Sequence, residues 1–167
     1  MALFMPKVMF EHITDIEPEF FIEHGIKALV LDIDNTLTTH DNPIPHEGII
    51  EWVGRIKEIG IHPFVISNNS AERVAPFAKK IGLDFIPDAK KPLTFGITKM
   101  CKKFNFSKKE TAIIGDQIFT DIMAGNLKGI LTVLVTPYEP ENGWFFKLKR
   151  KLEKPIIRNF YKKRRSR

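Results

Sequence analysis

Short apolar runs alternate with longer amphipathic stretches along most of this 167-residue chain, from residue 27 to about residue 136. The apolar runs have the length of strands and lack polar alternation, which is typical of strands buried on both faces of a sheet. Repeated strand-then-helix order favours a parallel sheet with helices on both faces. We therefore predict an α/β, Rossmann-like fold of about five strands, at 27–33, 62–67, 84–87, 111–116 and 130–135.

The chain divides into three predicted parts. The core domain spans 27–143, with helices expected at 46–60, 70–82, 92–104 and 118–129. Residues 1–26 are expected to form a helical extension that packs on the core, and residues 144–167 a basic, aromatic helix and tail. In this last helix we expect Pro155 to set a limit, because proline inside a helix removes a hydrogen bond.

Polar residues follow four of the predicted strands at the point where each strand ends. Because ligands bind at the carboxyl ends of parallel strands, these side chains are expected to meet at one edge of the sheet. The set comprises Asp32, Asp34, Ser67, Asn68, Lys90, Lys91 and Asp116.

Asp32 and Asp34 stand two positions apart at the end of an apolar run, where they repel each other and lose solvation. A divalent cation removes this repulsion, and Mg²⁺ prefers a few carboxylates together with a substrate phosphate. Asp116 and Asp121 add acids from a neighbouring strand end and the next helix. Lys91 supplies the base that would neutralise a phosphoryl group.

The order D-x-D-N-T-L, S-N-N, K-P and G-D-x-x-x-T-D resembles the four motifs of the haloacid dehalogenase-like phosphatases, over residues 27 to about 136. The resemblance implies that Asp32 is the nucleophile and forms an aspartyl-phosphate. It implies that Asp34 is the general acid for the leaving oxygen and then the base for water. Lys91, which precedes Pro92, would stabilise the charge on Asp32 and on the transferring group.

The same resemblance implies the binding residues. Ser67 would hold the phosphoryl oxygens, with Asn68 and Thr36 as further substrate contacts. Mg²⁺ would be bound by Asp32, Asp116 and the backbone carbonyl of Asp34, with Asp121 as a ligand or beside the ligands. The acidic side chain of Asp34, next to the nucleophile, favours hydrolysis of a phosphate monoester, because an alkoxide leaves poorly unless it is protonated.

Substrate choice is expected to depend on what lies outside these motifs. The segments between Asp34 and Ser67 and between Asn69 and Lys91 are too short for a cap domain, so the predicted site is open to large substrates. Residues 147–167 hold eleven Lys and Arg against the single acid Glu153, which points to a polyanionic partner. On a helix, the residues Trp144, Phe145, Leu148 and Leu152 share or adjoin one face, and they suit an anionic membrane surface.

Sequence segments along nearly the whole chain, from "DIDNTLTTHDNP" to "PYEPENGWFFKLKRKLEK", resemble the YqeG-type group of subfamily IIIA phosphatases, which is related to phosphatidylglycerophosphate phosphatases. This implies removal of the terminal phosphate of an anionic phospholipid precursor. The basic tail leaves two alternatives open: it packs on the body, or it attracts a nucleic acid with a terminal phosphate. Hydrolysis of a small metabolite is a further alternative, and no protein partner is inferred.

A phospho-accepting receiver domain is an alternative of another class. It shares the parallel sheet and the acidic pair, and Asp88 follows the third predicted strand. However, Lys91 comes too early for that family, and Asp116 stands where it requires Ser or Thr. The single Cys101 and the lack of a leader or a long apolar span predict a cytoplasmic protein, with peripheral attachment to the inner face of the membrane through the tail.

Overall fold

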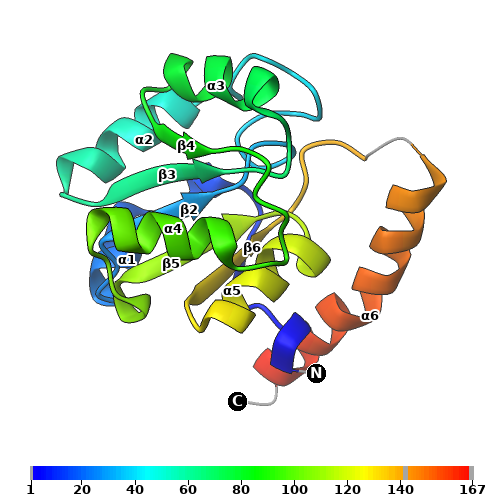
Figure 1. Cartoon of the computed structure of the whole chain (residues 1–167). Coiled ribbons are helices and arrows are strands. Elements are labelled where there is room, and N and C mark those ends of the chain that lie inside the picture. Colours follow the sequence, from blue (N-terminus) through cyan, green and yellow to red (C-terminus); the bar gives the residue numbers. More distant parts are fainter. Residues whose placement is uncertain (1, 141–142, 166–167) are drawn as a thin grey trace.

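Six parallel strands form the centre of the computed structural model, which describes residues 2–140 and 143–165 (Figure 1). The strands lie in the order β1-β6-β5-β2-β3-β4, and each pairs in parallel with its neighbours. The α/β fold with a parallel sheet is therefore confirmed. The strands are β1 (Val8–Phe10), β2 (Ala28–Leu31), β3 (His62–Ile66), β4 (Asp84–Ile86), β5 (Thr111–Gly115) and β6 (Leu131–Val135).

Helices cover both faces of the sheet. The helices α1 (Pro18–Glu23), α2 (Ile49–Glu58) and α3 (Ala71–Lys80) contribute to one apolar core, with Phe21, Trp52 and Phe77 among its largest buried side chains. On the opposite face, α4 (Phe95–Phe104) and α5 (Met123–Lys128) contribute to a second core. Neighbouring residues of β2 enter different cores, since Leu29 and Leu31 face one and Ala28 and Val30 the other.

The expected helical extension at 1–26 is wrong in one respect, because it contains a sixth strand as well as α1. The strand β1 adds to the edge of the sheet beside β6, with Val8 opposite Val133. At three half-buried residues, β1 is too short to give a readable alternation of apolar and polar positions. Its place in the sheet comes from pairing with a strand about 125 residues away, which local sequence does not encode.

The expectation that Pro155 limits the last helix is also wrong, because α6 runs without interruption over Trp144–Arg165. Ile156 and Ile157, directly after the proline, pack against a small core that includes Ile118 and Ile122. We attribute the continuation of the helix to this packing, which offsets the hydrogen bond that proline removes. The side chain of Phe145 lies outside the described residues.

The connections that could have held a cap domain are fully described and contain one α-helix each. Residues 32–61 include α2, and residues 67–83 include α3. The carboxyl edge of the sheet is thus left without an inserted domain over it. Within the described part of the chain, none of the helices combines the length and the apolar character that crossing a bilayer requires.

Candidate active site

A tight turn after β2 brings both aspartates of the first motif to the carboxyl edge of the sheet. The carbonyl of Ile33 accepts hydrogen bonds from the N–H groups of Thr36, Leu37 and Thr38. Asn35 has a φ of 57°, a left-handed conformation that asparagine tolerates better than most residues. The chain therefore reverses direction between Asp34 and Thr36. The residues Asp32 and Asp34 are thus not part of a continuing strand.

Four charged residues from three strand ends form what we call the inner cluster: Asp32, Lys91, Asp116 and Asp121. The Lys91 ammonium donates to Asp32 Oδ1 and to Asp121 Oδ1, each at 2.6 Å. The side chain of Lys91 is 2% exposed and that of Asp121 is fully buried, whereas that of Asp32 is 13% exposed. Asp32 is therefore the carboxylate of this triad that faces solvent and an entering substrate.

Burial dominates the electrostatics of the inner cluster. It raises the pKa of Asp32 to about 7, against the opposing effect of Lys91. It also raises the pKa of Asp116 well above its ordinary value, although the Arg150 guanidinium opposes this shift. For Lys91, burial acts to lower the pKa, but the carboxylates of Asp121 and Asp32 outweigh it and the pKa is raised. Lys91 is accordingly a permanent cation, while the carboxylates of Asp32 and Asp116 need more positive charge nearby to ionise together.

The inner cluster fits a divalent cation. Asp32, Asp116 and Asp121 each offer an oxygen, and these atoms lie within 4.8 Å of one another. Asp116 Oδ1 is buried and has no hydrogen-bond partner in the described part of the chain. Three carboxylates face two cations, Lys91 and Arg150, so a further positive charge is needed for all three to be ionised and neutralised together. Carboxylate oxygens in this arrangement suit a hard divalent cation.

Asp121 reaches the cluster because the chain folds tightly around it. It belongs to η4 (Ile118–Ile122), one turn of π-helix of the kind that often occurs at functional sites. Its Oδ2 accepts from the N–H of Gln117 at 3.3 Å and from the Thr120 hydroxyl at 3.2 Å. A Cβ atom on Gly115 would collide with the Asp121 carboxylate, so the glycine of the G-D motif is required for this approach.

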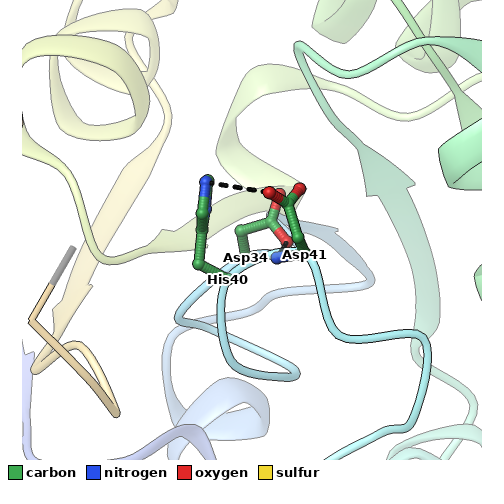
Figure 2. Close-up of side chains that lie close together, drawn as sticks. All are labelled: Asp34, His40 and Asp41. Carbon is green, nitrogen blue, oxygen red and sulfur yellow. Dashed lines mark hydrogen bonds and ion pairs between the residues drawn. The ribbon is translucent and has the colours of Figure 1, made fainter. Parts of the chain in front are cut away.

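Asp34 lies apart from the inner cluster in an outer cluster with Asn69 and Arg73. Arg73 Nη2 donates to Asp34 Oδ1 at 2.8 Å, and the Asn69 amide donates to Asp34 Oδ2 at 2.5 Å. Figure 2 shows His40 and Asp41 beside Asp34, with the N–H of Asp41 donating to Asp34 Oδ1 at 3.2 Å. His40 and Asp41 are exposed and the oxygens of Asp34 are already hydrogen-bonded, so we assign no metal to this second group.

The three predicted substrate contacts differ in their surroundings. Ser67 is buried, and its Oγ accepts from the N–H of Asn69 at 3.2 Å. Thr36 is buried, and its hydroxyl has no hydrogen-bond partner among the described residues. The Asn68 amide donates to the Lys91 carbonyl at 3.0 Å and accepts from the Lys91 N–H at 2.6 Å. Asn68 thus holds the backbone of Lys91, and we assign it a positioning role in place of the predicted contact with substrate.

Sequence reasoning missed four site residues: Asn69, Arg73, Arg150 and Glu153. Arg150 reaches Asp116 from α6, with Nη1 donating to its backbone carbonyl at 2.7 Å and Nη2 donating to Oδ2. Glu153 is 2% exposed and accepts from Arg150. A signal for Glu153 was available, because it is the single acid among eleven bases of residues 147–167. None was available for Arg150, which looks like its basic neighbours.

Comparison with known proteins places this chemistry in a family. Residues 1–138 match the family model described as mitochondrial PGP phosphatase. The probable phosphatase YqeG of Bacillus subtilis (strain 168) is 34% identical over 154 residues, which are 92% of this chain and 90% of that protein. Phosphatidylglycerophosphate phosphatase 1, chloroplastic/mitochondrial, of Arabidopsis thaliana is 26% identical over 95% of this chain, which spans about half (49%) of its length.

Solved structures agree on the fold. The cobalt-bound form of the deoxy-D-mannose-octulosonate 8-phosphate phosphatase YrbI from Haemophilus influenzae has a TM-score of 0.52 and 16% identity, and the similarity covers 82% of this chain and 90% of that one. The receiver alternative has no support here, since Asp88 is exposed and is not one of the described residues that form the carboxylate triad. The chain therefore belongs to the PGP phosphatase family and is a phosphoric monoester hydrolase, and its four motifs resemble those of the haloacid dehalogenase-like phosphatases.

Proposed function

We propose that this phosphatase is Mg²⁺-dependent, acts through an aspartyl-phosphate on Asp32, and removes the terminal phosphate of an anionic phospholipid precursor such as phosphatidylglycerophosphate. The observation that carries the proposal is the inner cluster, in which a partly exposed carboxylate, Asp32, lies beside the buried Lys91 and two further carboxylates. A metal ion bound by Asp32, Asp116 and Asp121 would offset the charge that the substrate brings.

In the first step Asp32 attacks phosphorus, so that a bond from its carboxylate oxygen to phosphorus forms and the ester P–O bond breaks. Asp34 gives its proton to the leaving alcohol oxygen. Lys91 stabilises the charge on Asp32 and on the phosphoryl group in transit. Since Asp34 accepts from Arg73 and Asn69 in the present arrangement, it has to exchange one of these partners to carry that proton.

In the second step Asp34 takes a proton from water, and the water oxygen attacks phosphorus. The P–O bond to Asp32 breaks, which releases inorganic phosphate and returns Asp32 as a carboxylate. Ser67 and Thr36 are the hydroxyls that we assign to the phosphoryl oxygens. The lack of a described partner for the Thr36 hydroxyl supports this assignment.

Two observations support a lipid substrate. A relative of the chain carries the name phosphatidylglycerophosphate phosphatase, and the family model carries a PGP phosphatase description. The outer face of α6 presents Trp144, Leu148 and Leu152 at intervals of four residues, with 77%, 44% and 53% exposure. Lys147, Lys151 and Lys154 are exposed along the same helix, which suits an anionic lipid surface.

The substrate proposal is tested by a panel assay in which Mg²⁺ is present or chelated. The substrates are phosphatidylglycerophosphate in mixed micelles, an end-phosphorylated oligonucleotide and a soluble aryl phosphate. We expect kcat/KM for the lipid to exceed the other two by about 100-fold or more, and chelation to abolish turnover. Faster hydrolysis of the oligonucleotide would favour the nucleic-acid alternative, and equal rates would indicate an unselective phosphatase.

The lipid-facing role of α6 needs substitutions rather than deletion, because deletion would also remove Arg150 from Asp116. The double variant Leu148→Ser, Leu152→Ser should weaken binding to phosphatidylglycerol vesicles about tenfold and leave hydrolysis of the aryl phosphate unchanged. The matched control is Ile44→Ser, which alters an exposed apolar residue outside α6. Vesicle binding equal to that of the wild type would remove α6 from the proposal.

A further inference from the structure

We propose that Arg150 of α6 is a positioning residue that fixes the carboxylate of Asp116 for metal binding, so that the C-terminal helix completes the active site. The inference rests on the proposed function only in taking Asp116 as a metal ligand. It assigns a role to a residue that lies 34 positions beyond Asp116 and outside the four motifs.

Two nitrogen atoms of the Arg150 guanidinium contact the same residue, Asp116, and we call this pair of hydrogen bonds the fork. Arg150 Nη1 donates to the Asp116 carbonyl at 2.7 Å, and Nη2 donates to Asp116 Oδ2. A guanidinium has a planar arrangement of donors, so these two bonds fix the side chain of Asp116 relative to its own backbone. Asp116 Oδ1 is then left as the carboxylate oxygen without a hydrogen-bond partner among the described residues, and it is buried.

Glu153 links Arg150 to the segment that carries Asp121. Its Oε2 accepts from Arg150 Nη1 at 2.9 Å, and its Oε1 accepts from the N–H of Ile118 at 2.8 Å. Ile118 begins η4, which carries Asp121. The buried Glu153 and the partly exposed Arg150 of α6 therefore contact both chain segments that deliver carboxylates from beyond β5 to the inner cluster.

The position of α6 is itself secured away from these polar contacts. Ile156 and Ile157, one turn further along α6, pack against the core formed by Ile118, Ile122 and Leu134. Figure 1 shows α6 along the side of the molecule, close to the N-terminal segment. The apolar contacts thus hold the helix on the body, and Arg150 and Glu153 use that position to orient the ligands. Outer partners of metal ligands commonly change metal affinity by 10- to 100-fold.

The test measures Mn²⁺ binding to the full chain by electron paramagnetic resonance, without substrate. We expect Arg150→Met to raise the Kd for Mn²⁺ about tenfold or more, and Arg150→Lys to recover only part of the loss because an ammonium cannot form the fork. Glu153→Gln should raise the Kd several-fold. Lys151→Met is the matched control, since it removes one positive charge from the exposed side of the same helix and should change the Kd by less than about twofold.

Circular dichroism and the thermal midpoint establish that each variant is folded. A folded Arg150→Met variant whose Mn²⁺ affinity equals or exceeds that of the wild type would overturn the inference, since Arg150 would then be neutral or competing with the metal. Unchanged affinity in Asp116→Asn would overturn it as well, because Asp116 would not be a ligand. If Arg150→Met weakens Mn²⁺ binding but the lipid phosphate is not hydrolysed, only the proposed substrate fails.

Discussion

Asp32 and Asp34 are two positions apart in the sequence, yet they belong to different electrostatic environments. Asp32 lies in the inner cluster, where it pairs with a lysine that is 2% exposed and shares that lysine with Asp121. Asp34 lies in the outer cluster, hydrogen-bonded to Arg73 and Asn69 from the start of α3 and the loop before it. Asp32 directly follows β2, whereas Asp34 lies within the turn that closes on the Ile33 carbonyl.

This difference matches a division of labour between the two carboxylates. The inner cluster is mostly buried, and its members lie just beyond strand ends or in the tight turn η4, so its geometry is fixed by regular structure. The outer cluster comes from a loop and a helix, and its partners can be exchanged while Asp34 gives and takes a proton. A nucleophile needs a fixed position next to stabilising charge, whereas a proton carrier needs a partner that it can leave.

The largest effect is expected at the nucleophile. Asp32→Asn keeps the shape of the side chain but removes the attacking carboxylate, so turnover should fall by about 10⁴-fold or more on every substrate. The measurement is the single-turnover rate with Mg²⁺, with circular dichroism as the check on folding. A loss smaller than about tenfold would mean that another residue attacks phosphorus.

The next largest effect is expected at Lys91 of the inner cluster, where the loss of stability should depend on the metal ion. Lys91→Met leaves the buried Asp121 and the partly exposed Asp32 without their cation, which should destabilise the fold by about 3–5 kcal/mol when metal is chelated. Millimolar Mg²⁺ should restore part of this loss, because it supplies positive charge at the same place. Urea unfolding with and without Mg²⁺ measures both quantities. If Mg²⁺ has no effect on the variant, the triad is not the metal site.

A smaller effect is expected in the outer cluster. Arg73→Met removes the cation beside Asp34 but leaves the inner cluster intact, so we expect kcat to fall about 10-fold and Mn²⁺ affinity to stay unchanged. Arg55→Met is the control, because Arg55 pairs with Glu17 on an exposed surface. A change in metal affinity in Arg73→Met would show that the two clusters are not separate.

The smallest effect is expected at the exposed pair of Lys27 and Glu110, with which the effects in the two clusters can be compared. Hydrogen bonds from Lys27 and Ser107 lower the pKa of Glu110 from an ordinary value of 4.5 to about 2. A carboxyl whose pKa falls on folding stabilises the fold above its unfolded pKa, and this contribution is lost as the pH drops towards the folded pKa. Lys27→Met should therefore lower the urea midpoint slightly at pH 7, and the difference should shrink below about pH 4.5. A difference that is constant with pH would exclude this linkage.

The inner cluster was largely readable from the sequence, because each member belongs to one of the motifs that follow the predicted strands. The motifs predict Asp32, Lys91, Asp116 and Asp121 as site residues, and the structure brings them together. The partners of Asp34 were not readable, since Arg73 lies one turn into a helix, where an arginine also serves as an ordinary surface charge. Arg150 was hidden for the same reason among eleven bases.

The fold, like the site, is only partly predictable from the sequence. Continuous apolar runs predict the strands β2, β3, β5 and β6, because burial on both faces of the sheet disfavours polar residues. The strand β1 and the continuation of α6 through Pro155 depend on partners distant in the chain. Local patterns specify what a segment can become, and long-range packing decides it where the pattern is weak.

The central claim is that phosphate passes through a covalent bond to Asp32. It is tested most directly by quenching a single turnover of radiolabelled phosphatidylglycerophosphate, or of the best substrate in the panel, with acid and mapping the labelled peptide by mass spectrometry. We predict that the label lies on Asp32, in the peptide that contains "LDIDNTL", and that it disappears in alkali as an acyl phosphate does. A label on any other residue would contradict the account, as would turnover in which no labelled enzyme forms.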